Sequence, residues 1–265
     1  MLKLLSSAIT GDLSSIKRPH NIALTTVALA LMPIFPLWMR RQERLGKPIL
    51  IPNSLWANLP FSTICLLVLV SWGVVNSMEL FFSLFFQNVQ HLSALQASIR
   101  FLPNVIGGVI MNVCTGLLIH RLRADTLVLS TFVISAVSPL LMAFIQPQWS
   151  WWWCAFWAVL IGPVSVDVIY TVGNLVIVDI FPSSRHALAG AVFNTVAQFG
   201  SSLGFAVMAI ISSSITKSQT TGTTAEALLL GYKGAFWTCF GLMASGCAVS
   251  GFGLRKLGRV GLKKE

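Results

Sequence analysis

The chain has 265 residues, of which 55% are hydrophobic and 10% charged, with 18 Lys and Arg against 8 Asp and Glu. Soluble domains carry about 25% charged residues, so this composition excludes a soluble domain, a disordered chain, a collagen and a disulfide scaffold. The net charge of +10 lies between apolar blocks rather than along one face, which excludes a nucleic-acid module and predicts a multi-pass protein whose partner is the lipid bilayer.

Seven stretches of low charge have the length, about 20 residues, that crosses a bilayer. Backbone groups in the bilayer core must be paired within the segment, so these stretches are predicted to be helices and the fold to be all-α. Pro33 and Pro36 interrupt the first stretch, and Gly162-Pro163 is predicted to kink the fifth. The predicted spans are residues 21–39, 61–86, 99–119, 125–145, 151–178, 187–213 and 234–254.

The distribution of Lys and Arg predicts the orientation. Alternate loops and the C-terminal tail hold twelve of the 18 basic residues, which assigns them and the C-terminus to the cytoplasm. With seven spans the N-terminus is then external, yet residues 1–20 contain no secretory signal. Either the flanking charge of the first helix inverts the start, or, as we favour, the natural chain begins upstream of Met1.

Two carboxyl groups, Asp167 and Glu79, lie in the interior of predicted spans, where an ionisable residue costs about 2.5 to 3.5 kcal/mol and indicates function. Asp167 lies near the middle of the fifth span, four residues after the Gly162-Pro163 kink. It is the first candidate for proton coupling; the alternative is a carboxyl that only bonds a neighbouring helix. Glu79 is the second candidate, and it either lines a cavity or extends its carboxyl toward the membrane surface.

Four amide side chains are candidates for lining a substrate cavity: Asn112, Asn174, Asn194 and Gln198. Asn194 and Gln198 are four residues apart and therefore share a helix face. Hydrogen bonding between helices is the alternative role for all four.

Small residues recur at helix-packing spacing and predict close helix contacts. They are Gly107, Gly108 and Gly116 in the third span, Gly190, Gly200 and Gly204 in the sixth, and Gly241, Gly246 and Gly253 in the seventh. The five cysteines all lie in apolar blocks and are interpreted as buried hydrophobic residues. Trp149 and Trp151 to Trp153 are interpreted as an interfacial belt.

Enzyme motifs are weak. His120 and Asp125 have the H-x-x-x-x-D spacing of membrane acyltransferases, but the short loop between two spans leaves little room for an acyl donor. The chain has no G-x-x-x-x-G-K-[ST] motif for a nucleotide-driven pump. We therefore expect no enzyme activity, no metal and no cofactor.

Several strings together resemble the 14-helix drug:proton antiporters of the major facilitator superfamily, in their fungal branch. They are ERLGKPILIP at 43–52, FFQNVQHLSALQASIRFLPNVIGG at 85–108, LLIHRL at 117–122, and the segment from Pro163 to Gly204, which includes Asp167, Asn174 and Phe193-Asn194. His120 stands where that family usually has Asp, which places the gating role of this loop in doubt.

The resemblance implies the C-terminal half of an exporter that moves small organic molecules by alternating access in exchange for protons. The implied organisation is an N-terminal segment at 1–20, a linker-type helix and basic cytoplasmic loop at 21–60, a six-helix transporter half at 61–254, and a basic cytoplasmic tail at 255–265. Transport then requires the missing N-terminal half or a second copy of the chain. The plasma membrane is favoured over the vacuole, and the alternative function is a non-transporting half-carrier that interacts with another membrane protein.

Overall fold

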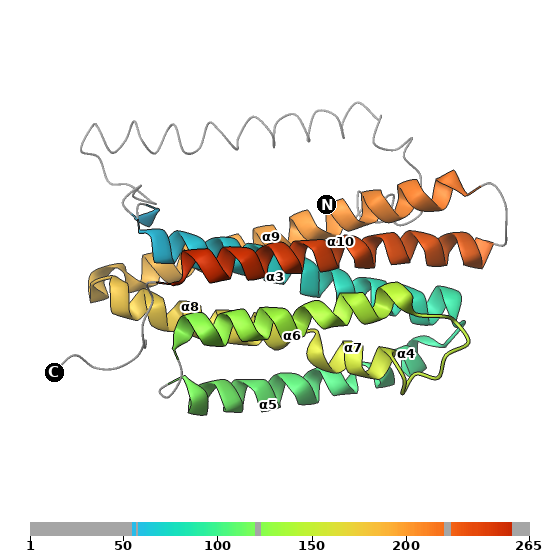
Figure 1. The fold of residues 1–265 in the computed structure, drawn as a ribbon, viewed down its shortest axis with the longest axis horizontal. Helices are drawn as coiled ribbons and strands as arrows, with labels where there is room; N and C mark the ends of the chain where they lie inside the picture. The colour runs from blue at the N-terminus through green and yellow to red at the C-terminus, as the bar shows by residue number, and fades with distance from the viewer. Residues whose placement is uncertain (1–54, 57, 120–122, 220–223, 256–265) are drawn as a thin grey trace.

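The computed structural model describes residues 55–56, 58–119, 123–219 and 224–255, and every regular element in this part of the chain is a helix (Figure 1). In chain order the helices are α3 (Leu59–Leu84), the π-helix η3 (Phe85–Val89), α4 (Ala94–Arg100), α5 (Leu102–Leu118), α6 (Ala124–Phe144), α7 (Ala155–Ile161), α8 (Val164–Ile180), α9 (Ser183–Ser218) and α10 (Thr224–Gly253).

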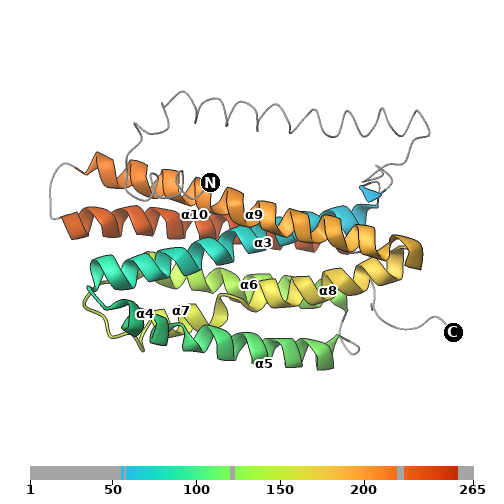
Figure 2. The ribbon, with the colours of Figure 1, turned by 180° about the vertical axis from the view of Figure 1, so that it is seen from behind.

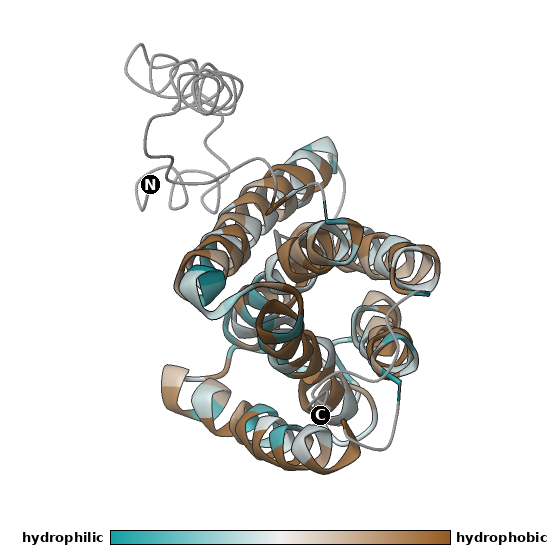
Figure 3. Ribbon diagram, turned by 90° about the vertical axis from the view of Figure 1, so that its left-hand side faces the viewer, coloured by the Kyte–Doolittle hydropathy of each residue, from teal (hydrophilic) through white to brown (hydrophobic). Residues whose placement is uncertain are grey.

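These helices form six segments long and apolar enough to cross a membrane: Leu59–Val89, Ala94–Leu118, Ala124–Phe144, Ala155–Ile180, Ser183–Ser218 and Ala225–Gly253. The predicted all-α membrane bundle is confirmed, with six of the seven predicted spans in the described residues. The other predicted span, residues 21–39, lies outside them. Hydrophobic residues dominate the six spans on their outer as well as their inner sides (Figure 3), as is expected of helices surrounded by lipid.

Local sequence accounts for where several helices begin. The Asn58 side chain accepts a hydrogen bond from the Phe61 amide at 3.4 Å and caps α3. Ser93 and Gln96 form a reciprocal capping box at the start of α4, which satisfies two backbone donors that the helix leaves unpaired. Proline in the first turn of α5 removes a donor that would have no partner there.

The helix α3 packs most extensively against α9, and α10 against α6. Gly73 of α3 lies against Gly200 and Gly204 of α9, so that a Cβ atom on Gly200 would collide with the Leu69 backbone and one on Gly204 with the Gly73 backbone. Glycine permits this close crossing because it has no side chain.

The other predicted glycine contacts divide into two groups, apart from Gly108, where a Cβ would be in ordinary contact, 3.4 Å from Asp167 Oδ2. Close neighbours are present at Gly107, which lies against Leu160, at Gly246 against Phe132, and at Gly253 against Thr63. The prediction is wrong at Gly116, Gly190 and Gly241, where a Cβ would meet no described atom within 4 Å. Spacing along a helix does not determine which side of it faces the bundle, and these glycines face outward.

One helix, α5, lies at the edge of the bundle in both side views (Figures 1 and 2), and its main partners are α7 and α8. Only 17% of the most apolar window of its span is buried. The connection between α6 and α7, residues 145–154, carries the clustered tryptophans at the end of the bundle where α3 finishes and α4 begins, and Gln90 Nε2 donates to the Pro147 carbonyl there at 3.4 Å. We call this end the tryptophan end.

Candidate functional site

The fifth predicted span is broken where the sequence predicts a kink. The helix α7 ends at Ile161, Gly162 and Pro163 intervene, and α8 begins at Val164. Proline has no amide hydrogen and cannot continue the backbone ladder. In a bilayer core the backbone groups that a break releases need other partners, and here serine side chains supply them.

The hydroxyl of Ser135, on α6, is inserted into the broken ladder. It accepts a hydrogen bond from the Ser165 amide at 2.8 Å and donates one to the Ile161 carbonyl at 3.3 Å. Ile161 and Ser165 are four residues apart, so they are the pair that would bond directly in an unbroken helix. The Ser135 hydroxyl therefore replaces one helical hydrogen bond and holds the two helices apart.

Two further serine contacts fix the same break. The Ser138 hydroxyl donates to the Ala158 carbonyl at 2.7 Å, and the hydroxyls of Ser71 and Ser165 lie 2.9 Å apart. All of these serine side chains are buried. The break is thus tied to α6 on one side and to α3 on the other, which makes it a defined joint in the middle of a span.

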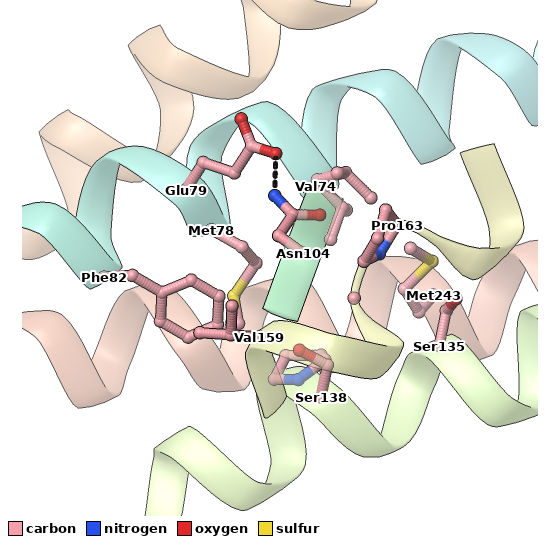
Figure 4. Close-up of a pocket in the computed structure, with 13 residues that line it drawn as sticks. Val74, Met78, Glu79, Phe82, Asn104, Ser135, Ser138, Val159, Pro163 and Met243 are labelled. Atoms are coloured by element: carbon pink, nitrogen blue, oxygen red, sulfur yellow. Dashed lines mark hydrogen bonds between the residues drawn. The ribbon is translucent and has the colours of Figure 1, made fainter. Parts of the chain in front are cut away.

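Glu79 reaches the same region from α3. Its Oε1 atom accepts a hydrogen bond from Asn104 Nδ2 of α5 at 2.7 Å, and the two side chains point toward each other in Figure 4. They border a cavity of about 10 Å³ whose other walls include Val74, Met78, Phe82, Val159, Pro163 and Met243. Such a volume is about what one water molecule requires.

Asp167 lies near the middle of the span Ala155–Ile180, at the contact between α8 and α5. Its Oδ2 atom would be 3.4 Å from a Cβ built on Gly108, and the Asn112 amide approaches the same carboxyl. Oδ2 is buried and has no hydrogen-bond partner among the described residues. A buried polar atom without a partner is rare and costly. Four other described side chains, Trp72, Trp151, Ser213 and Ser250, also have such an atom, and Asp167 is the one carboxyl group among the five.

Asn104, Gly108 and Asn112 are spaced by four residues and share one face of α5. Asn104 bonds Glu79, and the next two positions adjoin Asp167. With a rise of 1.5 Å per residue, the positions of Asn104 and Asn112 are about 12 Å apart along the helix. The two predicted carboxyl candidates are therefore separate, but one face of α5 connects them.

A band of exposed polar groups continues from Asp167 onto α9. Tyr170 and Asn174 follow Asp167 on a similar face of α8, and the Tyr170 hydroxyl donates to Asn194 Oδ1 of α9 at 2.6 Å. Gln198, one turn further along α9, is exposed and has no hydrogen-bond partner among the described residues. The structure places the four predicted amides, Asn112, Asn174, Asn194 and Gln198, at exposed positions on α5, α8 and α9.

Three of these amides also bond their own helix. Asn112 Nδ2 donates to the Gly108 carbonyl at 2.9 Å, Asn174 Nδ2 to the Tyr170 carbonyl at 3.0 Å, and Asn194 Nδ2 to the Gly190 carbonyl at 3.1 Å. Their orientations are consequently fixed by the backbone. The side-chain oxygens of Asn112 and Asn174 accept no hydrogen bond from another described residue and are free to accept one from a ligand.

Other sequence features do not join this site. Asp125 forms an ion pair with Arg123 at 3.0 Å, and His120 lies outside the described residues. The five cysteines are unpaired, three of them buried and two partly buried, and burial raises the pKa of the Cys154 thiol in the loop before α7. No group of three potential metal ligands occurs in the described ranges.

Sequence reasoning missed the serine contacts at the break. The signal that was available is the pair Ser135 and Ser138, three residues apart on one predicted helix, together with a Gly-Pro pair that must expose backbone groups on another. The partnership of Glu79 with Asn104 left no such signal, because it depends on how α3 and α5 are rotated.

Residues 21–205 match the family model described as Major Facilitator Superfamily. The chain is 39% identical to the "MFS-type transporter 1" of Pyricularia oryzae, over 96% of this chain and 45% of that protein. It is 26% identical to the "Efflux pump terJ" of Aspergillus terreus, over 63% of this chain and 31% of the pump. It is 22% identical to the "Low affinity ammonium transporter" of Saccharomyces cerevisiae, over 91% of this chain and 44% of that transporter. The chain thus spans less than half the length of each of these relatives. Since the family model covers more than half of the chain, the protein belongs to the major facilitator superfamily of membrane transporters.

Proposed function

We propose that the chain forms the C-terminal half of a proton-coupled exporter of small organic molecules that works by alternating access. The observation that carries the proposal is Asp167, whose buried Oδ2 atom lacks a partner at the middle of a broken span. In transporters of this architecture the two halves meet around a site near the bilayer midplane. The similarity to a protein named as an efflux pump supports export as the direction.

Asp167 is suited to carrying a proton. In the conformation described here its Oδ2 atom is closed off between α5 and α8, where a neutral carboxylic acid is far less costly than a carboxylate. A conformation that opens this contact to water would favour release of the proton. Glu79 is the second candidate, and its hydrogen bond to Asn104 already compensates part of its burial.

The exposed amides provide the substrate surface in this proposal. Asn112, Asn174, Asn194 and Gln198 are exposed on three helices. Asn112 adjoins Asp167 and Asn194 bonds Tyr170, three residues further along α8. Amides offer both donors and acceptors to a small organic molecule. Tyr170 adds an aromatic ring, whose centroid lies 5.5 Å from that of the Phe193 ring, with the two planes tilted by 42°. A second transporter half, either the N-terminal half or another copy of this chain, would close the cavity from the opposite side.

The break at Gly162-Pro163 supplies the moving part. Broken helices in membrane proteins are tolerated where they line a cavity or are buried in protein. Here the break lies four residues before Asp167, so a change of angle at the joint shifts the carboxyl relative to Gly108. The proposed location is the plasma membrane. The proposed orientation has the C-terminus in the cytoplasm, as the distribution of Lys and Arg favours.

The test is reconstitution of a complete transporter. The chain is co-expressed in yeast with the part of the Pyricularia oryzae transporter that has no counterpart in it, and efflux of rhodamine 6G from the cells is measured. We expect efflux when both parts are present, none from the partner part alone, and a reduction by Asn194→Leu. Efflux from cells that express this chain alone would identify a second copy as the closing half. Thr195→Val is the matched control, because adjacent helical positions point about 100° apart.

Two results would contradict the proposal. One is efflux that the Asn194→Leu and Thr195→Val variants reduce equally. The other is a complex of the two parts that is isolated intact but moves neither rhodamine 6G nor other organic cations and anions, which would favour the non-transporting half-carrier.

A further inference from the structure

Arg100 lies near the start of the candidate span Ala94–Leu118 and has no ion-pair partner among the residues that the structure describes. It is the last residue of α4, at the tryptophan end, and donates a hydrogen bond to Gln90 Oε1. Its guanidinium carbon lies 5.3 Å from the centroid of the Phe86 ring and 6.0 Å from that of Trp151. No carboxylate lies within ion-pair distance of it among the described residues.

A guanidinium carries five N–H donors, and the described residues supply an acceptor for one of them. The neighbouring rings attract the positive charge but offer no oxygen. Arg100 is also partly buried, so part of its hydration is already lost. The arrangement holds the side chain in place and leaves its charge available to an anion.

A cavity of about 570 Å³ adjoins this side chain. Its lining includes Gln90, Arg100, Trp149, Ser150, Trp151 and Trp152. A second cavity of about 290 Å³ shares Arg100 and Trp151 and extends to Gln96 and Ile99. The guanidinium therefore faces a space large enough for a headgroup, at the level where tryptophans gather at the membrane surface.

An apolar track begins at the same place. Ile99, Leu102 and Val105 are 55%, 55% and 65% exposed, and the exposed apolar face continues along α5 at Ile106 and Val109. A hydrocarbon chain lying against α5 would thus have its polar end at Arg100. A free anion would contact Arg100 but not the apolar track, whereas a lipid would contact both, with its headgroup at Arg100 and its acyl chain along α5.

We propose that Arg100 and the tryptophan end bind the phosphate of an anionic phospholipid whose acyl chain lies along α5. Arginine suits this ligand because its planar donors match phosphate oxygens in pairs. No described carboxylate lies near Arg100 to neutralise it, so a headgroup with net negative charge is favoured over a zwitterionic one, which brings its own cation. The proposed orientation places the tryptophan end on the side opposite the cytoplasm, so this preference rests on the contacts of Arg100 and not on the anionic lipids of the cytoplasmic leaflet. The site stands on its own contacts and does not depend on the direction or substrate of transport.

Native mass spectrometry of the chain in detergent micelles tests this proposal with phosphatidylglycerol and phosphatidylcholine as probes. We expect phosphatidylglycerol to bind more tightly than phosphatidylcholine, and Arg100→Gln to weaken its binding about tenfold, the loss expected for a hydrogen bond between charged groups. Arg100→Lys should restore part of the affinity. Arg123→Gln is the control, since it removes an equal charge from a residue already paired with Asp125.

A photoreactive phosphatidylglycerol gives a second measurement that needs no variant. It should label peptides from residues 94–105 or 145–154 of the wild-type protein. Equal affinity of the wild-type and Arg100→Gln proteins, displacement of the lipid by inorganic phosphate, or labelling confined to other peptides would each overturn the proposal.

Discussion

Removal of the Ser135 hydroxyl tests how the broken span is held. In Ser135→Ala the Ser165 amide loses its acceptor at 2.8 Å and the Ile161 carbonyl loses its donor at 3.3 Å. A buried backbone group left without a partner costs about 1 to 3 kcal/mol, whereas hydrogen bonds between membrane helices average about 0.6 kcal/mol.

The loss of stability expected for Ser135→Ala lies between the average for a hydrogen bond between membrane helices and the full cost of unpaired backbone groups. The two released groups are four residues apart and can partly recover by bonding each other, which would straighten the joint. We therefore expect Ser135→Ala to lower the free energy of unfolding by about 1 to 2 kcal/mol. Ser138→Ala should cost less, because the Ala158 carbonyl keeps its bond from the Gly162 amide at 3.1 Å.

The assay is reversible unfolding of the purified chain in bicelles, with Ser130→Ala as the matched control. Ser130 is exposed on the same helix and donates to the Leu127 carbonyl of its own helix at 2.9 Å. The control should change stability by less than about 0.5 kcal/mol. If Ser135→Ala proves no more destabilising than Ser130→Ala, the hydroxyl does not support the break and the reasoning fails.

Two other substitutions test packing and polar pairing. Gly200→Ala should destabilise the bundle by about 1 to 3 kcal/mol in the same unfolding assay, because the new methyl group meets the Leu69 backbone. Gly190→Ala on the same helix, with no described atom within 4 Å, should be neutral or stabilising, and equal effects would refute the close crossing. Asn104→Ala should cost about 1.5 to 3 kcal/mol by removing the partner of Glu79; Glu79→Ala added to Asn104→Ala should then cost little more, and full additivity of the two losses would show that the pair is not coupled.

The sequence predicts the spans well because the physical constraint is local. A run of apolar residues must satisfy its backbone within itself in a bilayer, and proline interrupts the ladder wherever it stands, so the break at Gly162-Pro163 follows directly. The predicted helix ends are less accurate. The last helix begins at Thr224 rather than 234, because charged residues such as Lys233 end an apolar run without ending a helix.

The same local constraint does not predict which residues meet between helices. Asp167 and Glu79 stand out because a carboxyl in an apolar run is unusual whatever surrounds it. Their neighbours Gly108 and Asn104 depend on the rotation of α5, which hydrophobicity determines poorly in a helix that lipid surrounds on several sides. For the same reason Gly190 and Gly241 have ordinary packing spacing and yet face away from the bundle.

The proposed role of Asp167 as a proton carrier is tested most directly by flux under an imposed pH gradient. Inside-out vesicles containing the chain and its co-expressed partner half are energised, and uptake of rhodamine 6G is followed with the wild type, Asp167→Asn and the control Asp179→Asn, a change near the end of the same helix. We predict that Asp167→Asn abolishes uptake driven by the gradient while exchange of the dye down its own gradient continues, and that Asp179→Asn retains both. Gradient-driven uptake by Asp167→Asn at the wild-type rate would contradict the assignment of Asp167 as the coupling residue.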